Sequence, residues 1–143
     1  MSWFWLALSA SILWGLGYVI NQATLKYFDV LELLLFESAI IFATFVLYFI
    51  WRGQWNSFIN KLMNPKQLGL IVSSGLIYVV ASCLILKSIT SSNATWAAIV
   101  ESCYPLFTVI FAYIIFGEFQ LNVASGVGFI LILSGIIIVK LST

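Results

Sequence analysis

Long apolar stretches, separated by short polar connections, make up most of the chain. A helix needs about 20 predominantly apolar residues, at roughly 1.5 Å each, to cross the hydrocarbon core of a bilayer. Five stretches have that length, so we expect an all-α integral membrane protein with five transmembrane helices. The expected spans are residues 3–24, 30–51, 67–86, 95–116 and 121–141.

The one sizeable polar connection, residues 53–64, has its own periodicity. Its apolar residues recur at spacings of three and four: Trp55, Phe58, Ile59, Leu62 and Met63. This spacing predicts a short amphipathic helix that lies in the membrane interface between spans two and three.

Capping signals mark the starts of two spans. Asp29 and Glu32 have the spacing of a capping box ahead of span two. Asn64 followed by Pro65 combines an N-cap residue with the proline that first helical turns favour. The hydroxyl-rich residues 88–93 are expected to form a turn before span four.

Composition excludes several classes of function. Hydrophobic residues make up 63% and charged residues 8% of the chain, whereas soluble domains carry about 25% charged residues. With no histidine and only Cys83 and Cys103 as thiols, we expect no metal site, no disulfide framework and no cofactor. No basic cluster is present to bind nucleic acid, and no nucleophile–base pair indicates an enzyme.

Glu101 is the strongest candidate functional residue. It lies near the middle of span four, where an ionisable side chain is costly and usually functional. Pro105 lacks the amide that would bond the Glu101 carbonyl, so we expect a kink beside the carboxylate. The alternative is that Pro105 only kinks a packed helix and that Glu101 hydrogen-bonds a neighbour.

Glu37 lies at a comparable depth in span two. Each glutamate precedes the centre of its span by about 4.5 Å, and spans two and four run in the same direction. We therefore expect both carboxylates at one level of the membrane. Whether they share a cavity stays open at this stage.

Aromatic and amide side chains are expected to complete a substrate site. These residues are Trp14, Tyr18, Asn21, Tyr78, Trp96 and Tyr104. Carboxylates beside aromatic faces suit an organic cation. A proton would compete with that cation for the same acid, which is the basis of antiport.

Small residues form a stripe along span five. Ala124 and Gly128 are four residues apart, and Gly135 follows seven residues later on a similar face. Such stripes typically pack helix against helix. We expect this one to join two copies of the chain, with packing inside one protomer as the alternative.

Lysine and arginine are divided evenly across the membrane. With five spans, three of the six basic residues fall on each side. Because an excess of basic residues sets orientation, this tie predicts insertion both ways and antiparallel pairing. The alternative is that the N-terminal amine or a folding partner sets one orientation.

Short motifs in a fixed order also resemble a known family. They are Leu13-Trp14-Gly15 in span one, Tyr104-Pro105 in span four, Phe116-Gly117-Glu118 at its end, and Gly126, Gly128 and Gly135 in span five. Over essentially the whole chain, they resemble the EamA-type domain of the drug/metabolite transporter superfamily. The resemblance implies a single domain over residues 1–143, which forms one inverted-repeat unit and needs a second copy.

The resemblance implies a secondary transporter in the cell membrane. Glu37 stands where many members carry a basic residue, which argues against anionic substrates. We expect a small organic solute, such as a cation or an amphiphilic metabolite or drug, moved by proton-coupled alternating access in an antiparallel homodimer. The alternatives are a non-transporting assembly subunit, half of a heterodimeric transporter, and a lipid flippase.

Overall fold

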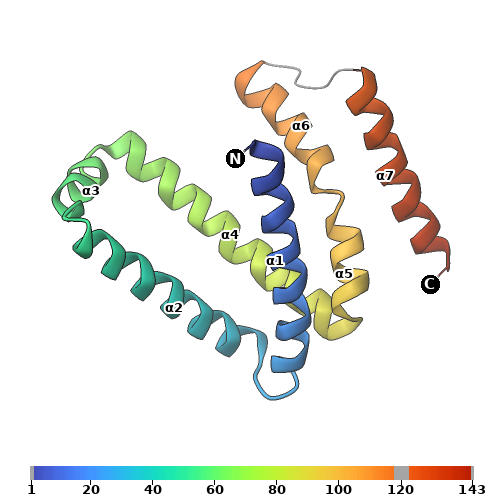
Figure 1. Ribbon diagram of the computed structural model, residues 1–143, viewed down its shortest axis with the longest axis horizontal. Helices are drawn as coiled ribbons and strands as arrows, with labels where there is room; N and C mark the ends of the chain where they lie inside the picture. The colour runs from blue at the N-terminus through green and yellow to red at the C-terminus, as the bar shows by residue number, and fades with distance from the viewer. Residues whose placement is uncertain (1, 118–122, 143) are drawn as a thin grey trace. The chain divides into compact units, whose positions relative to one another are not determined.

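The computed structural model describes residues 2–117 and 123–142, with side chains described over residues 2–117 and 126–141. Helices account for most of the described chain (Figure 1). They are α1 (Trp3–Thr24), α2 (Val30–Trp51), α3 (Trp55–Leu62), α4 (Pro65–Ser91), α5 (Ala94–Glu101), α6 (Tyr104–Phe116) and α7 (Val123–Ser142). The chain divides into two compact units: Met1–Tyr18 with Ser92–Thr143, and Val19–Ser91.

The helices have the lengths and apolar surfaces of a membrane protein. In the described residues, four stretches are long and apolar enough to cross a bilayer: Trp3–Thr24, Val30–Trp51, Pro65–Ser91 and Ala94–Phe116. Only 0 to 6% of the residues in their most apolar windows are buried inside the chain, which is appropriate for a lipid environment. This confirms an α-helical membrane protein.

A fifth span stays a prediction. The structure contains a shorter apolar helical stretch at Gly126–Leu141 within α7. The expected start of span five, at residues 121–122, lies outside the described residues.

The capping box predicted at Asp29 and Glu32 is present. The Asp29 Oδ1 atom accepts hydrogen bonds from the amides of Leu31 at 2.8 Å and Glu32 at 2.9 Å. The Glu32 carboxylate accepts one from the Asp29 amide at 2.9 Å. These bonds satisfy amides that lack partners inside the helix, and they fix the start of α2 at Val30.

In the unit Val19–Ser91, α2 and α4 pack together and α3 lies between them in the chain, contacting α4 (Figure 1). The Phe58 ring of α3 stacks on the Phe49 ring of α2, with ring centroids 5.3 Å apart. The short helix predicted within residues 53–64 corresponds to α3, Trp55–Leu62. Its location in the membrane interface stays a prediction.

Helix α4 is longer than the expected span of residues 67–86. It begins at Pro65, where the Asn64 side chain accepts hydrogen bonds from the amides of Lys66 at 3.1 Å and Gln67 at 3.4 Å. It continues to Ser91, and its late hydroxyls donate hydrogen bonds to carbonyls one turn earlier, as Thr90 does to Leu86 at 3.0 Å. The expectation of a turn across residues 88–93 is therefore wrong for residues 88–91.

The expected span at residues 95–116 is formed by two consecutive helices that meet at Ser102 and Cys103, whose backbone stays in the right-handed helical region. Together they make up one candidate span, Ala94–Phe116. Helix α5 ends at Glu101, and α6 begins at Tyr104 after Ser102 and Cys103. A proline ring clashes with the carbonyl four residues earlier, and for Pro105 that carbonyl belongs to Glu101. The structure avoids the clash by placing Pro105 in the first turn of α6, where a proline is tolerated.

Candidate functional site

Glu101 is the last residue of α5, and its side chain is half-buried. The Asn93 side chain fixes the start of this eight-residue helix, because its oxygen accepts a hydrogen bond from the Trp96 amide at 2.9 Å. The cap at one end and the break before Pro105 at the other thus place Glu101 at a helix terminus inside a candidate span.

Tyr18 binds Glu101 directly. The Tyr18 hydroxyl donates a hydrogen bond to Glu101 Oε2 at 2.5 Å, and this bond joins α1 to α5 within the first unit. A hydrogen bond to an ionised acceptor is shorter and stronger than a neutral one. The negative end of the α5 dipole disfavours a carboxylate at this position, and the phenol offsets part of that cost.

Trp14 lies one helical turn before Tyr18. Its ring centroid is 5.9 Å from that of Tyr18, with the ring planes tilted by 52°. The Trp14 side chain is 55% exposed, so part of the indole remains accessible next to the phenol. The side chains that meet here thus combine a carboxylate, a hydroxyl and two aromatic rings, from Glu101, Tyr18 and Trp14.

The charge of Glu101 has no basic counterpart in the described part of the chain. Its hydrogen-bond partner there is neutral Tyr18, and no ion pair to Glu101 is formed. The nearest hydroxyl along the chain, that of Ser102, instead donates to the Ala98 carbonyl at 2.9 Å. A carboxylate held by a neutral phenol can still accept a proton or pair with a cation.

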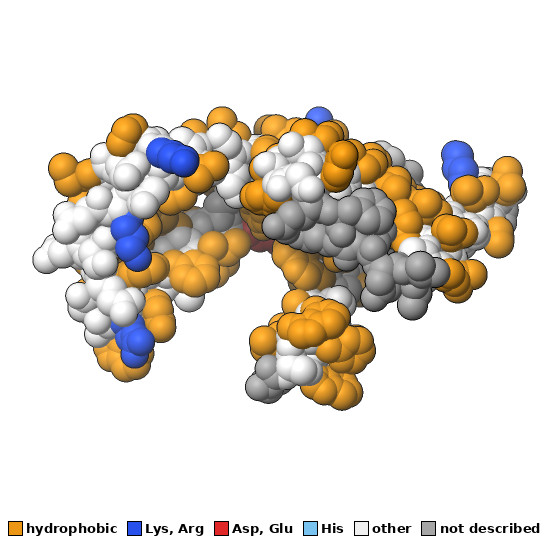
Figure 2. Space-filling view, turned by 90° about the horizontal axis from the view of Figure 1, so that it is seen from above, with side chains coloured by type: hydrophobic (Ala, Val, Ile, Leu, Met, Phe, Trp, Pro, Cys, Tyr) orange, Lys and Arg blue, Asp and Glu red, His pale blue; other side chains and the backbone are white. Residues whose placement is uncertain are grey.

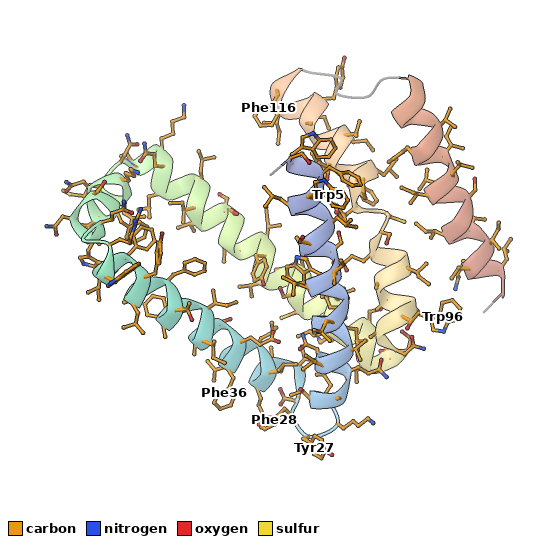
Figure 3. The ribbon with its side chains drawn as sticks, in the orientation of Figure 1. Trp5, Tyr27, Phe28, Phe36, Trp96 and Phe116 are labelled. Atoms are coloured by element: carbon orange, nitrogen blue, oxygen red, sulfur yellow. The ribbon has the colours of Figure 1, made fainter. Side chains whose placement is uncertain are left out.

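Trp96 and Tyr104 were predicted to belong to the same site. Trp96 lies in the first turn of α5, about 7.5 Å along the helix from Glu101. Figure 3 shows its ring on the side of α5 that faces away from α1. Tyr104 is the first residue of α6 and is 65% exposed. Their roles at Glu101 stay predictions.

Asn21, Glu37 and Tyr78 belong to the other unit, Val19–Ser91. Asn21 and Glu37 are half-buried, and Tyr78 is 52% exposed. Their shared site with Glu101 likewise stays a prediction. In the described residues, no group of three side chains suited to binding a metal is found.

The glycine stripe of α7 is open. Both Gly128 and Gly135 are exposed, and no described atom outside their own helix lies within 4 Å of a Cβ built at either position. A different face of α7 is half-buried, formed by Gly126, Phe129, Leu133, Ile136 and Val139. The Ala124 side chain lies outside the described residues.

The sequence indicated where this span is interrupted, but not which side chain contacts Glu101. Helices α5 and α6 meet at Ser102 and Cys103, just before Pro105, where the clash of a proline with the carbonyl four residues earlier predicts a kink. The pairing of Tyr18 with Glu101 has no local signal, because the two residues are 83 positions apart.

The fold and the site define a multi-pass α-helical membrane protein with an acidic residue at a break in an apolar span. The model of the EamA-like transporter family matches residues 1–141. The chain therefore belongs to the EamA-like transporter family, as its motifs indicated, and the family points to membrane transport rather than catalysis. Comparisons with curated proteins and with solved structures gave no match.

Proposed function

We propose that the protein is a secondary transporter of small organic cations, in which Glu101 binds substrate and proton in turn. The observation that carries this proposal is the Tyr18–Glu101 hydrogen bond. It holds a half-buried carboxylate in a candidate span with a neutral partner, next to the ring of Trp14.

The energetics favour a cationic ligand. A carboxylate away from bulk water is stabilised by a hydrogen bond, but its charge is compensated only by a cation or a proton. The faces of Trp14 and Tyr18 would add cation–π attraction, worth about 0.5–2 kcal/mol for each favourable contact. Because proton and cation exclude each other at one carboxylate, release of one accompanies binding of the other.

The broken span supports alternating access. Discontinuous helices are common at the substrate sites of secondary transporters, where the ends of half-helices lie at the site. The α5–α6 break next to Glu101 matches this arrangement. In this proposal, residues 1–143 form a single five-span domain, in which α7 is the fifth span and α3 lies in the membrane interface.

We further propose that two copies pair antiparallel in the cell membrane. The even division of basic residues and the open glycines of α7 support this pairing. An assembly subunit, half of a heterodimer and a lipid flippase are the competing functions.

The test is transport by purified protein in proteoliposomes with an imposed pH gradient. A thermal-shift panel of quaternary ammonium and aromatic cations, amino acids and lipids selects the substrate, because ligand binding to the folded state raises its stability. We expect pH-driven transport of a cation, and its loss in Glu101→Gln.

Glu32→Gln is the matched carboxylate control. Glutamine also fits the third position of a capping box, so α2 should start as before and transport should persist. Unchanged pH-driven transport in Glu101→Gln would overturn the proposal. Scrambling of labelled lipid without cation transport would favour a flippase, and transport only with a second protein would favour a heterodimer.

A further inference from the structure

The α3 end of the unit Val19–Ser91 is basic. Arg52 caps the C-terminus of α2, Lys61 lies in the last turn of α3, and Lys66 follows Pro65 at the start of α4. The sequence contains no aspartate or glutamate between Glu37 and Glu101. Figure 2 shows lysine and arginine side chains gathered at this end of the unit. The α3 end therefore carries three positive charges and no negative one.

These three charges are not neutralised by the described residues. Arg52, Lys61 and Lys66 are all exposed, and none forms an ion pair in the part of the chain that the structure describes. The Arg52 guanidinium lies over the Tyr48 ring, with its carbon 6.0 Å from the ring centroid. This contact steadies the arginine but leaves its charge uncompensated.

Aromatic rings lie beside the basic residues. Phe58 stacks on Phe49 and contacts Trp55, whose ring centroid is 6.0 Å away. Trp51, at the end of α2, is 80% exposed. Tryptophan beside basic residues is typical of the headgroup level of a membrane, because the ring is apolar and its N–H is a hydrogen-bond donor.

Helix α3 has two distinct faces. Phe58 and Leu62 are half-buried, whereas Asn56, Asn60 and Lys61 are exposed. An amphipathic helix with lysine on its polar face is the form that binds the surface of anionic membranes. The first turn of α4 adds the positive end of a helix dipole near Lys66.

We propose that the α3 end, formed by Arg52, Lys61 and Lys66 with the Phe49–Phe58–Trp55 rings, binds the headgroup of an anionic phospholipid. The basic side chains would contact the phosphate, and the rings would contact the glycerol region and upper acyl chains. Charge complementarity selects an anionic over a zwitterionic lipid, because a net positive site gains little from a neutral headgroup. This inference does not depend on what Glu101 transports.

Basic residues away from the α3 end supply a control variant with the same change in charge. Lys66 and Lys87 lie near opposite ends of α4, about 31 Å apart along its axis. Replacing Lys87, Lys26 and Lys140 by glutamine removes three positive charges, as many as replacing the three basic residues of the α3 end. The comparison therefore separates a local site from the effect of overall charge.

The experiment measures lipid binding to the purified full-length protein in detergent micelles. Phosphatidylglycerol or phosphatidylcholine is titrated in, and the midpoint of thermal unfolding is recorded at two salt concentrations. We expect phosphatidylglycerol, but not phosphatidylcholine, to raise the midpoint, and less so at high salt. Each basic residue removed should weaken the apparent affinity by roughly fivefold.

The decisive comparison is R52Q/K61Q/K66Q against K26Q/K87Q/K140Q. We expect the response to phosphatidylglycerol to be lost in the first variant and kept in the second. Equal responses in the two variants, or equal responses to the two lipids, would overturn the proposal. A response to glycerol 3-phosphate as large as that to phosphatidylglycerol would also overturn it, since the site would then recognise a free phosphate.

Discussion

Glu101 and Tyr18 meet although 83 positions separate them in the sequence. A half-buried carboxylate needs a donor, and the phenol supplies one without supplying a charge. The pair is therefore stable in the absence of a ligand and still able to bind a cation. This combination is what makes Glu101 a binding residue in our proposal rather than a residue locked in an ion pair.

The Tyr18–Glu101 bond can be measured by a double-mutant cycle. Tyr18→Phe removes the hydroxyl and keeps the ring, and it should cost about 1.5–3 kcal/mol if the hydrogen bond is made to an ionised Glu101. In a Glu101→Gln background the cost should fall to about 0.5–1.5 kcal/mol, since the remaining bond is neutral. The measurement is unfolding of the purified protein in detergent.

Tyr113→Phe is the control for that cycle, because Tyr113 lies on α6 and its side chain is 60% exposed. Its cost should be small and the same in both backgrounds. Equal costs of Tyr18→Phe with and without Glu101 would mean that the two side chains are not coupled.

Gly117 is required for its backbone conformation. It ends α6 with φ of 71°, and its amide donates to the Tyr113 carbonyl at 2.9 Å. A side chain at this left-handed position is strained, so Gly117→Ala should destabilise the protein by about 1 kcal/mol.

A second glycine, with an ordinary helical backbone, separates the cost of backbone strain from the cost of adding a side chain. Gly75 lies within α4 with nothing within 4 Å of a built Cβ, so Gly75→Ala should be neutral or slightly stabilising. The free energies of unfolding of both variants, measured side by side, test this account. A loss at Gly75 as large as that at Gly117 would contradict it.

At the scale of helices, local signals predicted the starts well. The Asp29 box and the Asn64–Pro65 pair each mark a helix start that the structure shows within about a residue, because capping depends on residues only two or three positions apart. Helix ends and breaks were harder. The last turn of α4 contains hydroxyl residues, which favour turns but also occur in helices, so they do not by themselves identify where a helix ends.

The α5–α6 break should matter more for transport than for stability. Pro105→Ala restores an amide and removes the clash at the Glu101 carbonyl, so it should allow α5 and α6 to join into a continuous helix. Glu101 would then lose its place at a helix end. We expect substrate binding within a few-fold of wild type and a transport rate at least about tenfold lower, since the break supports alternating access.

Pro65→Ala is the matched control, because Pro65 also occupies a first helical turn but begins α4, away from any break. It should leave the transport rate unchanged. Measuring binding by thermal shift and rate in proteoliposomes separates the two effects. Wild-type transport in Pro105→Ala would show that the break is not part of the mechanism.

At the scale of the whole molecule, membrane class and family followed from the sequence, because both depend on the order of apolar stretches and short motifs. The contacts within the candidate site could not be predicted from the sequence to the same degree. Trp14, Tyr18 and Glu101 were all candidates, but only the structure shows the contacts that join them. Asn21, Glu37 and Tyr78 are expected at the site from their residue types and depths, and this expectation stays a prediction because neither property determines which residues meet.

Pairing of two copies is the prediction that concerns the complete assembly. Gly128 and Gly135 are exposed and open, so a second helix can approach their backbone closely. Gly128→Leu with Gly135→Leu fills that space and should convert a purified dimer largely to monomer, as measured by light scattering in detergent. Gly69→Leu, at an open glycine of α4, is the control for added bulk and should leave the dimer intact.

Orientation can be tested in the same variants. With the basic residues divided evenly, a reporter fused to the C-terminus should be active on both sides of the membrane, and cross-links between copies should join oppositely inserted chains. Because a proposed transport unit contains one copy of each orientation, the double leucine variant should lose transport together with dimerisation while its reporter still appears on both sides. A reporter active on one side only would remove the antiparallel pairing, and a variant that transports as a monomer would remove the need for a second copy.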